Sequence, residues 1–224
     1  MMRKLIVAID GPSGAGKSSV TRALAERVGY TQIDTGAMFR VVALMAHRNG
    51  VNPDDENALA ELCAGLDIGF DLIAGAPVVL ANGEDVSSQI RSPEISLLTS
   101  KFAAIPLVRI YLLAIQRKMG EQGGVVLEGR DIGTVVFPNA DLKFFLTASA
   151  EERGRRRFAE LVAKGVQVTL EQTVAEVVQR DEQDMNRKSA PLMRAADAIE
   201  IDSTGLSPEE VISLMESHVR QRES

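Results

Sequence analysis

The sequence contains few of the cysteine and histidine residues that disulfides and many metal sites require. It contains one cysteine, Cys63, so no disulfide can form within the chain, and the leucines around this residue indicate a position in a packed core. The two histidines, His47 and His218, have neither a cysteine nor a second histidine nearby in sequence. Surface or helix-end positions are therefore expected for both, rather than a metal or catalytic role.

Positive charge and long apolar runs are also scarce. The 25 Lys and Arg residues are outnumbered by 31 Asp and Glu, and the net charge of -6 argues against a broad surface for nucleic acid or an anionic membrane. Only five apolar residues separate the start, residues 1–4, from Asp10, which is too short for a signal-peptide core or a membrane span. We expect a cytoplasmic monomer with no nucleic-acid or membrane partner.

The chain does contain a phosphate-binding loop near its N-terminus. Gly11 and Gly16 have four residues between them, Lys17 and Ser18 follow, and an apolar strand stands directly in front. In such a loop the backbone N–H groups point into one concavity at the positive end of a helix dipole. Lys17 can reach the β- and γ-phosphates, and the Ser18 hydroxyl can ligate Mg²⁺. A plain glycine-rich turn is the alternative. The predicted ATP-binding residues are Gly11, Pro12, Ser13, Gly14, Ala15, Gly16, Lys17, Ser18 and Ser19.

The order of apolar and amphipathic segments predicts an α/β protein. Predicted strands lie at 4–10, 30–34, 125–127, 142–147 and 198–202, and those at 4–10, 125–127 and 142–147 are apolar runs typical of a parallel sheet. They predict a P-loop NTPase fold, with a parallel five-stranded sheet flanked by helices. Alternating residues and an Asn82-Gly83 turn within 67–92 predict a small antiparallel β insertion. The predicted domains are a core of 1–66 and 93–224 within one kinase unit of 1–224, an inserted β module at 67–92, and a helical lid at about 150–190.

Charged residues follow the predicted strand at 125–127. Glu128, Arg130 and Asp131 come directly after it. In open α/β sheets, ligands bind outside the carboxyl ends of the strands, so these side chains are candidates for a site. A structural ion pair that pins a turn is the alternative.

Arginines gather on two helices late in the chain. Arg153, Arg156 and Arg157 lie at i, i+3 and i+4, which favours an anion clamp over a solvated charged face. On the helix from Leu170, Arg180, Asp184 and Arg187 lie at i, i+4 and i+7, one stripe that could face a ligand. The residues of this second helix expected to face inward are Val174, Val177 and Val178.

Four segments resemble those of the bacterial cytidylate kinases, and the similarity covers nearly the whole chain. The segments are 10–17, 34–40, 128–138 and the residues from Arg180-Asp181 to Asn186-Arg187. The resemblance implies an ATP:CMP phosphotransferase that converts CMP and dCMP to the diphosphates, with Mg²⁺ and with ATP as the phosphate donor. It also implies that the β insertion lies beside the monophosphate site.

The resemblance carries over to individual residues. The implied CMP-binding residues are Thr35, Arg40, Ser100, Arg109, Arg130, Asp131, Arg180, Asp184 and Arg187. Within this set, Ser100, Arg109 and Asp131 would face the cytosine, and Arg40 and Arg130 would hold the monophosphate. The implied catalytic residues are Lys17, Arg130, Arg153, Arg157 and Arg187, of which the Arg153–Arg157 segment would belong to the lid.

Some residues depart from the family pattern. Thr35 and Phe39 stand where Ser and Tyr are common, Glu128 stands where Asp is frequent, and Ser18-Ser19 replaces a Gly-Thr or Ser-Thr pair. Thr35 keeps its hydroxyl, but Phe39 lacks a phenolic donor.

Two other functions stay open: a P-loop kinase for UMP or another small metabolite, and a GTP-dependent switch. The switch would need a guanine-reading Asn-Lys-x-Asp segment, which the sequence lacks.

Overall fold

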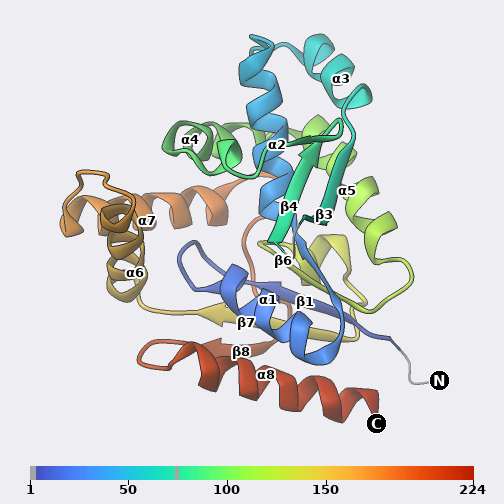
Figure 1. Cartoon of the computed structure of the whole chain (residues 1–224), viewed down its shortest axis with the longest axis vertical. Helices are drawn as coiled ribbons and strands as arrows, with labels where there is room; N and C mark the ends of the chain where they lie inside the picture. Colours follow the sequence, from blue (N-terminus) through green and yellow to red (C-terminus); the bar gives the residue numbers. More distant parts are fainter. Residues whose placement is uncertain (1–3, 74–75) are drawn as a thin grey trace. The chain divides into compact units, whose positions relative to one another are not determined.

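The computed structural model describes residues 4–73 and 76–224, and its backbone contacts divide the chain into two compact units (Figure 1). One unit comprises residues 1–33 and 120–224, and the other comprises residues 34–119. Of the N-terminal start interpreted above, residues 1–3 lie outside this description. The division into core, lid and inserted module stays a prediction.

A parallel sheet forms the centre of the first unit. Within the described residues it has five strands, β2 (Thr31–Asp34), β6 (Val125–Gly129), β1 (Ile6–Asp10), β7 (Leu142–Thr147) and β8 (Ile199–Asp202), in that spatial order. β1 pairs in parallel with both β6 and β7. Its central residues Val7, Ala8 and Ile9 are fully buried, because both faces of the sheet are covered. The predicted sheet is confirmed.

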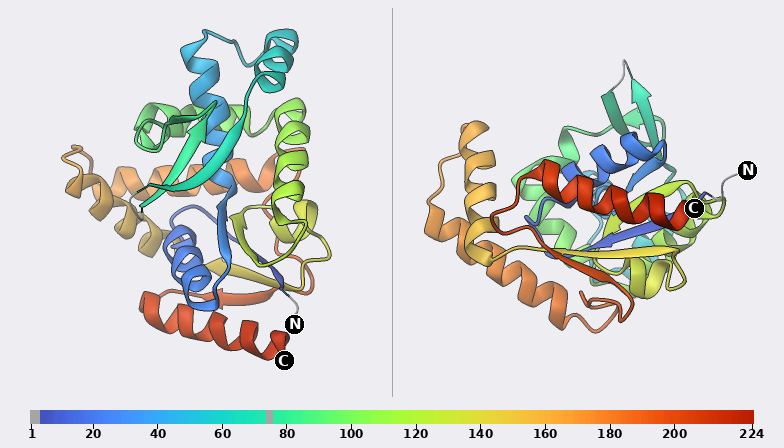
Figure 2. Two further views of the ribbon diagram at one scale, coloured as in Figure 1. Left: turned by 45° about the vertical axis from the view of Figure 1, so that its right-hand side comes forward. Right: turned by 90° about the horizontal axis from the view of Figure 1, so that it is seen from below.

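Helices cover this sheet. α1 (Lys17–Val28) and α8 (Pro208–Glu223) pack side by side on one face, where Leu24 and Met215 meet Val7 and Phe144 in a common core (Figure 2). After β6 the chain makes a π-helical turn, η2 (Ile132–Val136), which the sequence analysis does not predict. This turn and the loop after β1 both start at the carboxyl end of a strand.

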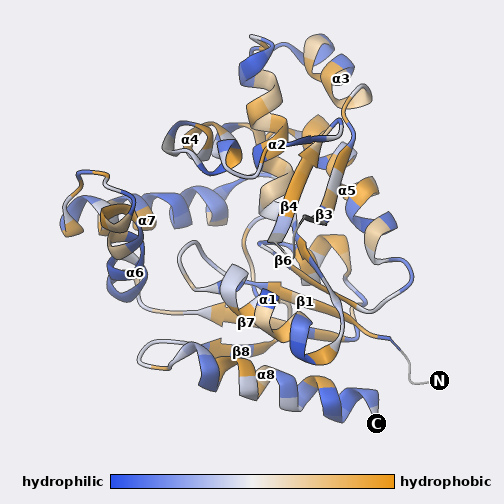
Figure 3. Cartoon of the chain, viewed as in Figure 1, coloured by the Kyte–Doolittle hydropathy of each residue, from blue (hydrophilic) through white to orange (hydrophobic). Residues whose placement is uncertain are grey.

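α6 (Ala150–Ala163) and α7 (Leu170–Asn186) pack against each other and carry largely hydrophilic surfaces (Figure 3). On α7, Thr173, Val177 and Asp181 are buried, whereas Val178 is 41% exposed. The prediction that Val178 faces inward is wrong. Buried positions recur every four residues here, and Val178 is turned about 100° from Val177 around the helix axis. The buried stripe therefore runs on to a carboxylate, that of Asp181.

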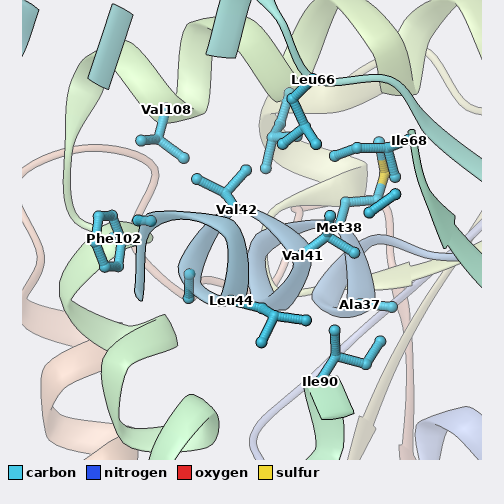
Figure 4. Close-up of a cluster of buried hydrophobic side chains, with 14 of the residues drawn as sticks. Ala37, Met38, Val41, Val42, Leu44, Leu66, Ile68, Ile90, Phe102 and Val108 are labelled. Carbon is cyan, nitrogen blue, oxygen red and sulfur yellow. The ribbon is translucent and has the colours of Figure 1, made fainter. Parts of the chain in front are cut away.

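α2 (Thr35–Arg48) is central to the second unit. Met38, Val41 and Val42 on this helix are fully buried among residues of its neighbouring elements (Figure 4). The other helical elements are α3 (Glu56–Ala64), the 3-10 turn η1 (Gln89–Arg91), α4 (Pro93–Phe102) and α5 (Pro106–Gly120). Cys63 on α3 is buried in the same core, as expected.

The predicted antiparallel sheet lies in this second unit. β3 (Ile68–Ile73) pairs with β4 (Ala76–Ala81), and β4 pairs with β5 (Glu84–Asp85). Asn82 and Gly83 connect β4 to β5 with positive φ angles of 50° and 81°, as a tight hairpin of this sequence requires.

Among the described residues, no single helix is both long enough and apolar enough to cross a membrane. Only α4 and α5 taken together have the required length and composition, and the two helices are bent by 96° where they join.

Candidate active site

The phosphate-binding loop connects β1 to α1, and close packing shapes its backbone. Gly11 has a φ of 149°, and a Cβ atom at this position would lie 1.9 Å from the carbonyl oxygen of Leu146 in β7. Only glycine fits there. The loop ends at Gly16, and the first turn of α1 contains no acidic side chain. The first backbone N–H groups of the helix are thus placed to accept an anion.

Lys17 is folded against this loop and is 7% exposed. Its Nζ donates to the carbonyl oxygens of Gly11 and Pro12 at 2.6 and 2.7 Å. Burial, and then the charge of Arg130, lower the pKa of the Lys17 ammonium well below its usual range. Both acceptors are neutral carbonyl groups, so a phosphate oxygen offers this ammonium a stronger partner.

A second set of polar groups lies beside Lys17, at the end of β6. The Ser18 hydroxyl donates to Oε2 of Glu128 at 2.7 Å, and the Gln32 side chain donates to Oε1 of the same carboxylate at 3.2 Å. Glu128 is only 3% exposed, whereas Ser18 is exposed. The site thus joins a hydroxyl at the start of α1 to a buried carboxylate. Sequence reasoning identifies both of these residues but misses Gln32.

Alternating charges continue from the end of β6 onto α7. Nε of Arg130 lies 2.8 Å from Oδ2 of Asp184, and the Arg187 guanidinium lies 3.3 Å from Asp131 and 3.7 Å from Asp184. Burial acts to raise the pKa of Asp184, but the charges of Arg130, Arg180 and Arg187 lower it below its usual value. The predicted stripe on α7 and the predicted cluster after β6 therefore form one network, which contains the ion pairs considered as the alternative.

The three arginines of α6 that were predicted to form an anion clamp have different surroundings. Arg153 is buried and bonded to the phosphate loop through the Ser13 carbonyl. Arg156 donates to Glu152 and to both oxygens of Ser203. Arg157 donates to the exposed Glu160. The side chains thus separate into an inner, an intermediate and an outer position, which their shared spacing along the helix does not reveal.

The remaining predicted residues belong to the unit of residues 34–119. Thr35 is buried at the start of α2, where the side chain of Asp34 caps the helix by accepting from the Ala37 N–H. Arg40 follows on α2 and Ser100 lies on α4, each partly buried.

The Arg109 side chain on α5 is fixed by two contacts within this unit. The guanidinium lies 5.3 Å from the centre of the Phe39 ring and donates to the Ala103 carbonyl at 3.1 Å. Phe39 therefore has a use that needs no phenolic oxygen, because a cation is attracted by the face of the ring.

Comparison with known proteins adds to this geometry. The sequence profile of the cytidylate kinases matches residues 7–221. The chain belongs to the cytidylate kinase family. Among the relatives that carry the name cytidylate kinase, one from Geobacter sulfurreducens is 63% identical, and the match covers 99% of this chain and 95% of the relative. One from Geobacter sp. strain M21 is 64% identical, with 97% of this chain and 94% of the relative covered. One from Pasteurella multocida is 48% identical, with 99% of this chain and 97% of the relative covered.

A solved structure agrees with the fold of this cytidylate kinase family member. An uncharacterized protein from Eubacterium ventriosum superposes with a TM-score of 0.54 over 97% of this chain and 99% of its own, at 11% identity. At that identity the similarity concerns the fold alone. The resemblance drawn from the four sequence segments is confirmed by the family match.

One buried group in this family member escapes sequence reasoning. Asp10, the last residue of β1, accepts hydrogen bonds from the backbone N–H groups of Ile132 and Gly133 at 2.8 and 2.7 Å. Burial raises the pKa of Asp10 to about 6, although the two hydrogen bonds act to lower it. Asp10 therefore holds the start of η2, next to Asp131. The only sequence signal is a carboxylate at the end of an apolar strand, because its partners are more than 120 positions away.

Proposed function

We propose that this protein transfers the γ-phosphoryl group of ATP to CMP and to dCMP. A phosphate oxygen of the monophosphate attacks the γ-phosphorus, the bond to the β-phosphate oxygen breaks, and ADP leaves together with the new diphosphate. The observation that carries the proposal is the phosphate loop with its inward-folded Lys17, in a chain of the cytidylate kinase family. The relatives named above support the choice of CMP as acceptor.

The loop supplies the ATP site in this proposal. The backbone of residues 11–16 and the start of α1 would surround the β- and γ-phosphates, while Ser18 and Ser19 stand on the exposed side of the helix start. Lys17 would leave its two carbonyl partners for the phosphates. Phosphoryl transfer of this kind needs no protein nucleophile, since alignment and positive charge around the migrating group lower the barrier.

We assign the acceptor, CMP, to the charged network at the end of β6 and on α7. The charge of Arg130 acts on Lys17, and the Arg130 guanidinium is paired with the carboxylate of Asp184. In this proposal the guanidinium binds a phosphate of the acceptor in place of that carboxylate. We assign Arg40, Arg180 and Arg187 to the phosphate and ribose of CMP as well. The base-reading residues in this proposal are Ser100, Arg109 and Asp131, and Thr35 is assigned to CMP binding.

Magnesium fits the residues at the start of α1. Mg²⁺ prefers oxygen ligands, and the Ser18 hydroxyl, with the buried Glu128 carboxylate 2.7 Å away, offers such a set. We propose that Ser18 ligates the ion and that Glu128 orients the Ser18 hydroxyl. When bound with ATP, the ion neutralises charge on the phosphates.

Arg157 is the outer of the two predicted catalytic arginines on α6. Its partner Glu160 is exposed, so the ion pair is weak and the guanidinium can leave it for a phosphate at little cost. Replacement by methionine should lower kcat more than it changes CMP affinity. A change in thermal stability alone would assign this side chain to the solvated surface instead.

A substrate panel tests the proposed function. ADP release would be followed in a coupled assay with ATP and one acceptor at a time: CMP, dCMP, UMP, AMP or no acceptor, with identification of the diphosphate product. Rapid ADP release with CMP and dCMP is the expected result. Acceptor-independent hydrolysis of GTP would favour a switch, and activity with a different acceptor alone would favour another metabolite kinase.

A cytoplasmic location, a monomeric state and the lack of nucleic-acid or membrane partners are further parts of the proposal. They are consistent with the acidic charge balance. Size-exclusion chromatography with light scattering tests the monomer, and fractionation of cells tests the location.

A further inference from the structure

Arg153 connects three segments of the chain from a buried position. Its Nε donates to the Ala148 carbonyl before α6, and its Nη1 donates to the Ser13 carbonyl in the phosphate loop, both at 2.9 Å. Its Nη2 lies 2.6 Å from the carboxylate of Asp181 on α7. The Arg153 side chain is only 7% exposed, so this charge is held inside the unit and is not presented to solvent.

The tip of the phosphate loop also packs directly on Arg153. Gly14 has a φ of 77°, and a Cβ atom built there would lie 3.1 Å from the Cβ atom of Arg153 and 3.2 Å from its carbonyl oxygen. The loop therefore lies against the backbone of α6, which in turn packs on α7 (Figure 1). The position of the loop depends on where α6 places Arg153.

The bond from Arg153 fixes the direction of one peptide group in the loop. The described residues contain no cis peptide bond, so the Ser13 carbonyl and the Gly14 N–H point in opposite directions. With the carbonyl held toward the Arg153 guanidinium, the Gly14 N–H is directed away from it. Rotation of this peptide would remove one N–H group from the set that binds an anion.

Asp181 keeps Arg153 in this position. Its Oδ2 pairs with Arg153, and its Oδ1 is buried without a hydrogen-bond partner among the described residues. If Arg153 moved out to a bound phosphate, this buried carboxylate would lose its countercharge, which is strongly unfavourable. Arg153 is therefore expected to keep its three bonds when a nucleotide binds.

We propose that Arg153 is a positioning residue for the triphosphate of ATP. Held by Asp181, it orients the Ser13–Gly14 peptide so that the loop presents its N–H groups to the β- and γ-phosphates. Direct contact with the phosphates is then left to Lys17 and to the more exposed arginines of α6. This inference rests on the proposed function, because it takes the loop to be the ATP site.

A double variant separates positioning from simple stabilisation. Arg153→Met together with Asp181→Leu removes both charges, leaves no buried carboxylate, and withdraws the donor from the Ser13 carbonyl. Replacing both members of a buried ion pair by apolar residues is tolerated far better than removing one. The binding of a non-hydrolysable ATP analogue and of CMP would each be measured by calorimetry, with thermal unfolding as the check on folding.

The ATP analogue should bind about tenfold or more weakly, as loss of a charge-assisted hydrogen bond predicts, with CMP affinity within about twofold of the unmodified protein. A folded double variant with unchanged affinity for the analogue would overturn the proposal. So would an equal loss for both ligands, because that outcome describes a general loss of structure.

Two further variants keep the test decisive. Arg153→Lys retains the charge beside Asp181, but a single ammonium lacks the guanidinium fork that donates to three acceptors. This variant should therefore bind the ATP analogue more weakly while its CMP affinity is unchanged. It provides the test even if the double variant does not fold. Normal analogue binding by Arg153→Lys would also refute the proposal. Arg27→Gln with Glu209→Gln is the matched control, because it removes an ion pair between α1 and α8 and should leave both affinities unchanged. Failure of the unmodified protein to bind the analogue would instead refute the proposed function.

Discussion

Replacement of Asp10 by asparagine should change how the stability of this protein depends on pH. The Asp10 carboxylate is 4% exposed, lies between β1 and η2, and has a pKa raised to about 6, chiefly by burial. A proton is therefore held more tightly in the folded state than in the unfolded chain. This proton contributes stability that is fully present below the unfolded pKa of 3.8 and is lost as the pH rises through about 6.

The size of the effect follows from the shift. At about 1.4 kcal/mol per pKa unit, a rise from 3.8 to about 6 corresponds to about 3 kcal/mol over the whole interval. Between about pH 4.5 and about pH 7.5, the contribution should change by about 2 kcal/mol. The asparagine side chain of the variant would not titrate, and it would turn an amide N–H toward one of the two backbone donors at a cost of about 1–3 kcal/mol that does not depend on pH.

Urea unfolding followed by far-ultraviolet circular dichroism at several pH values would measure the free energy of unfolding of both proteins. The free energy of unfolding of the unmodified protein, minus that of the Asp10→Asn variant, should be about 2 kcal/mol larger at about pH 4.5 than at about pH 7.5. Asp55→Asn serves as the control, because Asp55 also accepts a backbone N–H but is exposed. A difference that stays constant with pH, or that grows as the pH rises, would refute the reasoning.

Three further predictions concern single side chains. Lys17→Met should lower kcat by about 10²–10³-fold or more with little change in melting temperature, since we assign the buried ammonium to the transition state; near-normal turnover would remove the phosphate-loop assignment. Gly11→Ala places a Cβ atom 1.9 Å from the Leu146 carbonyl and should lower the melting temperature by about 10 °C or prevent folding, so a fall below about 2 °C would contradict the packing argument. Phe39→Leu removes the ring beside Arg109 and should raise KM for CMP about threefold while sparing kcat; an unchanged KM would show that the ring does not place Arg109 for binding.

Local patterns were sufficient to predict most of the fold. The strands at 6–10 and 142–147 are continuous apolar runs, and such runs occur where both faces of a parallel sheet are covered. The hairpin at Asn82-Gly83 follows from two residues that tolerate positive φ. In contrast, the π-helical turn at 132–136 was not predicted, because its start is held by Asp10 from a distant part of the sequence.

The candidate site was only partly predictable for the same reason. The loop and Lys17 are contiguous in sequence, so their motif identifies them. Arg153 and Arg157 look alike in the sequence, and only tertiary packing shows that one is buried against Asp181 while the other reaches the exposed Glu160. Helical spacing gives the face of a side chain but not what covers that face.

The most direct test of the account is the ratio of kcat/KM for CMP to kcat/KM for UMP. Cytosine presents an amino donor and a ring-nitrogen acceptor, and uracil presents the reverse. The carboxylate of Asp131 and the guanidinium of Arg109, which we propose to read the base, therefore suit cytosine and not uracil. A site that leaves buried polar groups unpaired rejects a ligand by up to about 10⁴-fold, and we therefore predict a ratio of at least about 10² that Asp131→Asn narrows. Equal use of CMP and UMP by the unmodified protein would contradict both the proposed acceptor and the residues assigned to read it.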